Sequence, residues 1–257
     1  MSLNFCFIGA GNLATHLSKA LQEKGFVISQ VYSRTEQSAK ELAELLSANF
    51  ITSVNKIDRK ADIYIVAVND SAVDQVLSQI NFNNKLIVHC SGSLPLSAIE
   101  KYSENFGVLY PLQTFSKKRE IDFSEIPVFI EANSAKNQKL LFEIASQISD
   151  SVSVINSDER KRLHISAVFA CNFVNHFYNI AADILKSKDI SFDVLKPLIL
   201  ETAKKVMEME PEKAQTGPAI RLDENIINAH LHELKDFGDY QELYRSISKS
   251  IFEHYNK

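Results

Sequence analysis

Gly9 and Gly11 stand where an apolar run near the N-terminus gives way to a helical pattern. With Ala14 they form a GxGxxA pattern, in which the first glycine permits a tight turn and the second lets the backbone approach a pyrophosphate. The amide groups at the start of the following helix would face the same anion. A turn that binds nothing could have the same glycines, but its place between a strand and a helix favours a dinucleotide site.

The predicted second strand ends in Ser33, Arg34 and Thr35, where an NAD site usually has Asp or Glu. A guanidinium and two hydroxyl groups suit the 2′-phosphate of NADP, so we expect NADP as the cofactor. The alternative is that Arg34 is a solvated loop residue. Glu36 also follows closely, and an acidic residue near this position is typical of NAD sites. The missing acid also argues against a methyltransferase that uses S-adenosylmethionine. The predicted cofactor-binding residues are Gly9, Ala10, Gly11, Asn12, Leu13, Ser33, Arg34, Thr35, Val68, Asn69 and Ser91.

Polar residues at the ends of later strands are expected near the nicotinamide. The backbone at Val68 and Asn69 would line the cofactor, and Asp70 is expected to cap the next helix. The polar candidates further along the chain are Ser91, Ser93, Gln113 and Thr114.

A second group of polar side chains lies in an apolar helix predicted over residues 161–189, which we expect to be buried. Asn172 begins a stripe with a spacing of three or four residues, and His164 lies about two turns before it. The other members of the stripe are Asn175, Asn179 and Asp183. Because buried polar groups need partners, we predict that Asn172 and His164 are catalytic. The alternative is that these groups make contacts between helices or along a dimer seam.

The order of the predicted elements indicates the fold class. Up to about residue 155, apolar strands alternate with helices, which predicts an α/β domain with a doubly wound, mainly parallel sheet. After that point the pattern is entirely helical. We therefore predict two domains, 1–155 for dinucleotide binding and 156–257 for the substrate and for dimerisation through its apolar helices. Predicted strands cover residues 3–9, 26–33, 62–70, 85–93, 106–113, 126–132 and 151–156.

Composition limits the classes of partner. The chain has 257 residues and a formal net charge of -4, so no basic excess suggests nucleic acid. No apolar run is long enough for a membrane span, and we expect no signal peptide. The three cysteines are few and far apart, which fits the cytoplasm better than a disulfide framework. His230 and His232 are two residues apart on a predicted helix and make a poor metal pair, so we predict no metal.

Six motifs are distributed over almost the whole chain: IGAGNLATHL, YSRT, VAVND, HCSGS, YPLQTFS and AQTGPAIRLD. Together they resemble the Rossmann-like NADP oxidoreductases of uncharacterised function, relatives of pyrroline-5-carboxylate reductase and of the β-hydroxyacid dehydrogenases. The resemblance implies an NADP-binding Rossmann domain followed by an all-α domain like the C-terminal domain of 6-phosphogluconate dehydrogenase. Such helical domains often form dimers, which implies a homodimer.

This chain departs from its relatives at two positions. The β-hydroxyacid dehydrogenases have a catalytic lysine four residues before such an asparagine, and this chain has Val168 there. Many relatives have histidine where this chain has Tyr110. The lysine mechanism therefore does not carry over, and the proton donors left to consider are His164, Tyr110, His230 and water.

Two functions fit these residues and motifs. The first is an NADP-dependent oxidoreductase that transfers a hydride to or from a small carbonyl, imine or hydroxyacid, and the polar stripe favours it. The second is a dinucleotide-binding sensor or regulatory protein that catalyses no reaction, and the missing lysine favours that alternative. The sequence does not identify a substrate.

Overall fold

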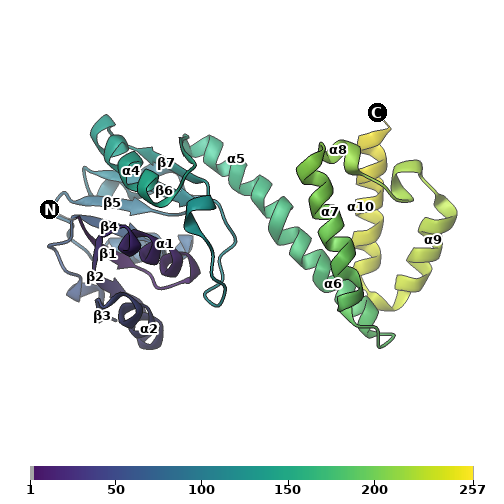
Figure 1. Ribbon diagram of the computed structural model, residues 1–257, viewed down its shortest axis with the longest axis horizontal. Coiled ribbons are helices and arrows are strands. Elements are labelled where there is room, and N and C mark those ends of the chain that lie inside the picture. Colours follow the sequence, from purple (N-terminus) through teal and green to yellow (C-terminus); the bar gives the residue numbers. More distant parts are fainter. Residues whose placement is uncertain (1–2, 257) are drawn as a thin grey trace. The chain divides into compact units, whose positions relative to one another are not determined.

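The protein is described by a computed structural model that covers residues 3–256 and divides into two compact units. The first ends at Asn172 and holds the sheet, and the second begins at Phe173 and is helical (Figure 1). The predicted fold class, a doubly wound α/β sheet followed by an all-α region, is confirmed. The predicted boundary after residue 155 lies just after the last strand, whereas the first compact unit extends to Asn172 and so includes the next helix. The assignment of separate functions to the two parts stays a prediction.

One eight-stranded sheet forms the centre of the first unit, with the order β3-β2-β1-β4-β5-β6-β7-β8. Its strands are β1 (Asn4–Ile8), β2 (Val27–Tyr32), β3 (Asn49–Ile51), β4 (Ile63–Val66), β5 (Leu86–His89), β6 (Phe106–Pro111), β7 (Val128–Ala132) and β8 (Val152–Val154). All neighbours are parallel except β6 and β7. The carboxyl ends of β1, β4, β5 and β6 therefore lie along one edge of the sheet. Sequence analysis missed β3, which is short and mostly exposed.

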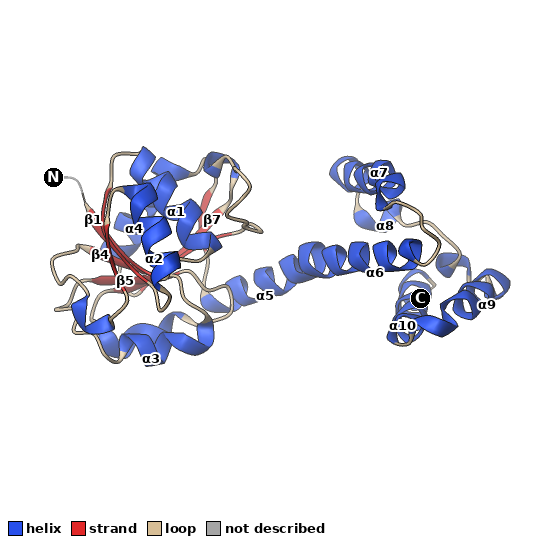
Figure 2. Ribbon diagram, turned by 90° about the horizontal axis from the view of Figure 1, so that it is seen from below, coloured by secondary structure: helices blue, strands red, loops and turns tan. Residues whose placement is uncertain are grey.

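Helices cover both faces of this sheet (Figure 2). They are α1 (Asn12–Glu23), α2 (Glu36–Leu46), α3 (Val73–Leu77) and α4 (Ala135–Ile148). Side chains alternate along β1, so that Phe5 and Phe7 pack with α1, α2 and α4, while Cys6 and Ile8 pack with α3 on the other face. Burial on both faces explains the continuous apolar runs in the sequence.

Helix α5 (Ser157–Ala167) begins with a capping box. The Asn156 side chain accepts hydrogen bonds from the N–H groups of Asp158 and Glu159, and the Glu159 carboxylate accepts one from the N–H of Asn156. A π-helical turn, Val168–Phe173, follows α5 and contains Asn172. Such turns occur frequently at functional sites.

The second unit contains five helices among its described residues. They are α6 (Val174–Lys186), α7 (Lys196–Glu208), α8 (Pro211–Ala214), α9 (Glu224–Glu233) and α10 (Asp239–Tyr255). The expectation that the long helix over residues 161–189 is buried is wrong for this single chain. Ile165 is 49% exposed and Phe169 is 65% exposed, so the apolar composition of this helix does not lead to burial of these side chains. No helix within residues 3–256 is both long enough and apolar enough to span a bilayer.

Candidate functional site

The glycine turn after β1 is built on a close backbone approach. Gly9 has φ +122°, and a Cβ added there would lie 2.3 Å from the carbonyl oxygen of Ala67, just beyond β4. Only glycine meets both conditions. A Cβ at Gly11 would have nothing within 4 Å, so this second glycine borders open space.

The N-terminus of α1 is open to an anion. Gly11 is its N-cap residue, no side chain caps the helix, and its first turn has no acidic residue. The N–H groups of the first helical turn have no partners within the helix, and the helix dipole adds partial positive charge there. A phosphate would supply the missing acceptors.

A cleft of about 310 Å³ opens beside this turn. Its lining comes from the ends of β1, β2 and β4 and from the helical segment that contains α3. The predicted cofactor-binding residues that line it are Gly9, Ala10, Gly11, Ser33, Arg34, Val68 and Asn69. Sequence analysis missed three polar lining residues, Ser38, Gln75 and Gln79, because helix positions on a solvent face carry no local signal. The cleft thus places Arg34 and two serines at the end distant from β5, without an acidic side chain in its lining.

Four predicted cofactor-binding residues lie outside this lining. The Asn12 amide donates a hydrogen bond to the carbonyl oxygen of Phe115 at 2.9 Å. Leu13 packs against the sheet core. Thr35 is the N-cap residue of α2, but its hydroxyl does not cap the helix and lies 3.5 Å from the Ser33 hydroxyl. Ser91 lies at the end of β5. The expectation that Asp70 caps a helix is wrong, because its carboxylate accepts a hydrogen bond from the Ser91 hydroxyl at 2.9 Å instead.

Tyr110 and His164 form a hydrogen-bonded pair at the neighbouring strand ends. The Tyr110 hydroxyl lies 2.9 Å from His164 Nδ1, and the two rings meet edge to face. Gly92 provides the space for the imidazole, because a Cβ there would lie 2.6 Å from the His164 ring. The Tyr110 side chain is buried and His164 is half-buried. The structure therefore brings together two of the groups that sequence analysis considered as proton donors.

The environment of Tyr110 keeps its phenol protonated. Burial raises the pKa of Tyr110, and the positive charge of Arg160 lowers it in part. A protonated phenol can donate to an unprotonated imidazole nitrogen. The pair can accordingly hold a proton next to the carboxyl ends of β5 and β6.

His89, the last residue of β5, is a second buried imidazole. Its Nδ1 accepts a hydrogen bond from the N–H of Ser91 at 3.2 Å. Burial, with the positive charge of Arg160 second, lowers the pKa of His89 from its usual 6.5 to about 3. His89 is therefore neutral at physiological pH and helps to fix the chain where it leaves β5.

The polar stripe does not gather around one point. The Asn172 side chain is exposed and makes no hydrogen bond within residues 3–256. In the second unit, the Asp183 carboxylate accepts hydrogen bonds from the Asn179 amide at 3.5 Å and from the Tyr240 hydroxyl at 2.8 Å. The bond to Tyr240 joins α6 to α10, so Asp183 makes a helix–helix contact, the alternative that sequence analysis left open, whereas the bond from Asn179 lies within α6.

Asp223, the last residue of the AQTGPAIRLD motif, and His230 both have structural partners in the helical unit. Asp223 caps α9, since its carboxylate accepts a hydrogen bond from the N–H of Ile226 at 3.3 Å. His230 Nδ1 lies 2.8 Å from the Tyr244 hydroxyl. Over residues 3–256, no group of three or more His, Cys, Asp or Glu side chains could hold a metal ion.

Comparison with known proteins assigns this arrangement to a family. Residues 4–92 match the family described as "NADP oxidoreductase coenzyme F420-dependent", and residues 126–251 match a "Domain of unknown function". A crystal structure of a "putative NADP oxidoreductase" from Bacteroides fragilis is 50% identical, with 98% of each chain covered and a TM-score of 0.95. The chain belongs to this NADP oxidoreductase family. The resemblance in the sequence motifs is thereby confirmed, and NADP is the cofactor of the family, as predicted.

More distant proteins are similar to this chain in fold or in part of the sequence. An imine reductase from Myxococcus stipitatus, solved in complex with NADP⁺, is 17% identical with a TM-score of 0.68, and the match covers 97% of this chain and 92% of that one. A curated relative from Caenorhabditis elegans, "Putative pyrroline-5-carboxylate reductase 4", is 29% identical over 105 residues. That match spans 38% of this chain and only 35% of the relative.

The lowered pKa of His89 predicts a pH dependence of stability. The unfolded state binds a proton below pH 6.5 and the folded state only near pH 3, so stability is complete above 6.5 and is lost as the pH falls. We expect His89 to cost about 1.4 kcal/mol of unfolding free energy per pH unit in that window. Urea denaturation at pH 6.5 and 5 should show this slope in the native protein and a smaller slope in His89→Asn. The exposed-site control His254→Asn should keep the native slope; equal slopes in all three proteins would contradict the assignment.

Proposed function

We propose that this protein is an NADP-dependent oxidoreductase that transfers a hydride to or from a small imine, carbonyl or hydroxyacid. The observation that carries the proposal is the juxtaposition, within one unit, of the cleft at Gly9 and Gly11 with the hydrogen-bonded Tyr110 and His164. The segments that follow β4 and β5 connect the cleft with the pair. The Asp70 carboxylate, beyond β4, accepts a hydrogen bond from the Ser91 hydroxyl, beyond β5. The next residue, Gly92, lies against the His164 ring.

The cleft fits the cofactor of the family. The uncapped start of α1 would hold the pyrophosphate, and the open space at Gly11 would let it approach the backbone. Arg34, with Ser33 and Ser38, would bind the 2′-phosphate, because a guanidinium can form two parallel hydrogen bonds to a phosphate. The backbone at Val68 and Asn69 leads from there toward the end of β5.

The chemistry divides between cofactor and protein. When bound, NADP(H) supplies or accepts the hydride, while the chain provides binding, orientation and the proton. Reduction of an imine or carbonyl leaves its nitrogen or oxygen in need of one proton. Tyr110, donating to Nδ1, would keep the proton of the neutral His164 ring on Nε2. As His164 delivers that proton, the hydroxyl proton of Tyr110 would pass to Nδ1, so that the ring stays neutral, and solvent would replace the proton lost to the substrate. In the reverse direction the same nitrogen would accept the proton.

Asn172 is the second proposed catalytic residue. It follows His164 by about two helical turns and lies in the π-helical turn, with an exposed amide that can donate to and accept from a substrate. The lysine of the β-hydroxyacid dehydrogenases has no counterpart here, since Val168 occupies its place. Without that lysine another group has to donate the proton, which supports His164 as the donor. The missing lysine also supports the competing function, a dinucleotide-binding sensor that is not catalytic.

Exposed apolar helices support a homodimer. Helix α7 contains no buried residue, and Leu198 and Leu200 are among its exposed side chains. Large apolar patches on soluble proteins mark interaction surfaces, and the dimeric helical domains implied by the resemblance favour a second copy as the partner. A cytoplasmic location is consistent with free thiols at all three described cysteines.

Cofactor selectivity tests the first part of the proposal. In calorimetric titrations with NADPH, NADH and S-adenosylmethionine, we expect NADPH to bind most tightly. Arg34→Gln should weaken NADPH roughly 10- to 100-fold, because it loses charge-assisted hydrogen bonds, and should leave NADH nearly unchanged. Lys60→Gln removes an exposed cation outside the cleft and should change neither. Absence of nicotinamide binding would refute the oxidoreductase function, and equal losses for both nucleotides would refute the role of Arg34.

Turnover tests the proton donor. The rate of NADPH oxidation should be measured with panels of cyclic imines, small ketones and aldehydes. His164→Gln should lower kcat roughly 100-fold or more, since it removes a general acid, and Tyr110→Phe should lower it less. Asn172→Ala should reduce turnover too, whereas His232→Gln, an exposed imidazole on α9, should not. Intact turnover in both His164→Gln and Asn172→Ala would contradict this placement of the site, and a wild type that binds NADPH but reduces no compound would favour the sensor.

Sedimentation velocity tests the homodimer. We expect the 29.0 kDa chain to sediment with twice its monomer mass, because pairing would cover the apolar surface of α7. The double variant Leu198→Glu/Leu200→Glu should sediment as a monomer, while Lys204→Glu on the same helix should remain dimeric. A monomeric wild type at micromolar concentration would contradict the proposal.

A further inference from the structure

A buried arginine joins α5 to the sheet next to the Tyr110–His164 pair. The Arg160 side chain is 1% exposed, and its guanidinium forms an ion pair with the carboxylate of Glu131 on β7. A second guanidinium nitrogen donates a hydrogen bond to the carbonyl oxygen of Leu94 at 2.6 Å. One planar group therefore fixes both a strand and the loop that follows β5.

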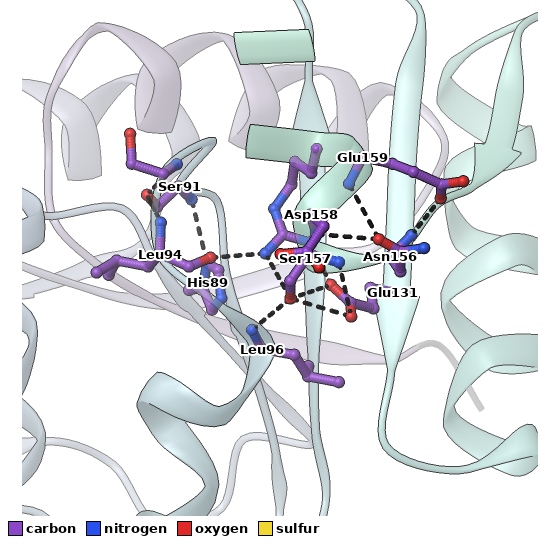
Figure 3. Close-up of polar contacts among 11 residues, drawn as sticks. His89, Ser91, Leu94, Leu96, Glu131, Asn156, Ser157, Asp158 and Glu159 are labelled. Atoms are coloured by element: carbon purple, nitrogen blue, oxygen red, sulfur yellow. Dashed lines mark hydrogen bonds and ion pairs between the residues drawn. The ribbon is translucent and has the colours of Figure 1, made fainter. Parts of the chain in front are cut away.

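Ser157, at the start of α5, makes a second connection between the same parts. Its hydroxyl lies 2.9 Å from a Glu131 oxygen, to which it donates, and it accepts the N–H of Leu96 at 2.8 Å. Figure 3 shows Glu131 and Ser157 next to one another, with a dashed line from Ser157 to the backbone of Leu96 below it and Leu94 to the left. The backbone of this loop is therefore held on both sides of Pro95.

The loop held in this way is the one that contains Gly92. Gly92 lies directly against the imidazole of His164, within the distance at which an added methyl group would collide. Arg160 and His164 are four residues apart on α5, so they lie on the same face of the helix. The helix thus contacts one loop at two points a single turn apart, through Arg160 and through His164.

We propose that Arg160 is a positioning residue for the Tyr110–His164 pair, acting through the Leu94 carbonyl and the Glu131 carboxylate. The Arg160 guanidinium holds the loop that follows β5 in place. That loop contacts the His164 imidazole at Gly92 and so keeps the ring at the Tyr110 hydroxyl. A lysine at this position would keep the positive charge. Its single ammonium group lacks the planar set of donors with which the guanidinium reaches both the Glu131 carboxylate and the Leu94 carbonyl oxygen. The proposal rests on the proposed function in one respect, namely that the pair serves the reaction.

The positive charge of Arg160 also acts on the Tyr110 hydroxyl. It opposes the effect of burial on the pKa of Tyr110, which would otherwise be raised further. Arg160 is itself absent from the lining of the cofactor cleft. Loss of Arg160 should therefore disturb the pair and leave NADPH binding intact.

The imidazole nitrogens of His164 can report this positioning directly by NMR, after assignment of its signals with His164→Gln. In the native protein at mildly alkaline pH we expect one fixed neutral tautomer with its proton on Nε2. In Arg160→Lys we expect averaged tautomers, as in a free imidazole, and NADPH affinity within about twofold. Where turnover is measurable, kcat should fall about tenfold with the KM for NADPH unchanged. Lys161→Met, which removes the adjacent exposed cation, should behave as wild type.

Two further variants test whether Arg160 acts through its contacts rather than through its charge alone. The double variant Arg160→Met/Glu131→Gln removes the ion pair without leaving a buried charge, and it should also lose the fixed tautomer. If the Arg160 variants do not fold, Ser157→Ala, which keeps all charges, should give the same change to a smaller degree. A fixed tautomer in every folded variant, or its loss in Lys161→Met, would overturn the proposal. Because this measurement needs neither cofactor nor substrate, its failure is distinct from failure of the proposed function.

Discussion

The contact between Gly9 and the carbonyl of Ala67 is the constraint on which the candidate site depends. It lets the chain turn from β1 into α1 directly beside the end of β4, in a conformation with positive φ that a side chain would disfavour. The start of α1 consequently opens toward the same edge as the ends of β2 and β4. A bulkier turn would separate β1 from β4 and close the cleft between them.

A reversal of strand direction supplies the other half of the site. The first six strands in chain order run parallel, and β7 returns antiparallel to β6. Because of this reversal, Glu131 on β7 lies beside β6 and meets the start of α5 through Arg160 and Ser157. The same helix continues to His164 and its contact with Tyr110. The parallel part of the sheet thus provides the cleft at Gly9 and Gly11, and the antiparallel addition anchors the helix that carries His164.

The position of Gly9, Gly11 and Arg34 around one cleft was predictable because its determinants are local. Gly9, Gly11 and Arg34 each follow directly from a strand, so periodicity and turn chemistry place them at one edge of a parallel sheet. The pairing of Arg160 with Glu131 was not predictable, because it joins residues on different elements through the antiparallel return. Asp70 has the spacing of a helix cap, yet the Ser91 hydroxyl, supplied by the next strand, competes for its carboxylate. Apolar composition predicted burial for the long helix, but burial depends on what covers a helix, and this chain alone leaves Phe169 exposed.

The distribution of the site along the chain has a consequence for biosynthesis. All residues that line the nucleotide cleft lie between Gly9 and Gln79, whereas the Tyr110–His164 pair is incomplete until α5 has been made. Synthesis proceeds from the N-terminus, and each domain generally folds as a unit. A nascent chain emerging from the ribosome therefore contains every cleft residue well before it contains the histidine. Because the cleft and the pair belong to one compact unit that ends at Asn172, we expect the cleft to take its final form only after α5 has been synthesised.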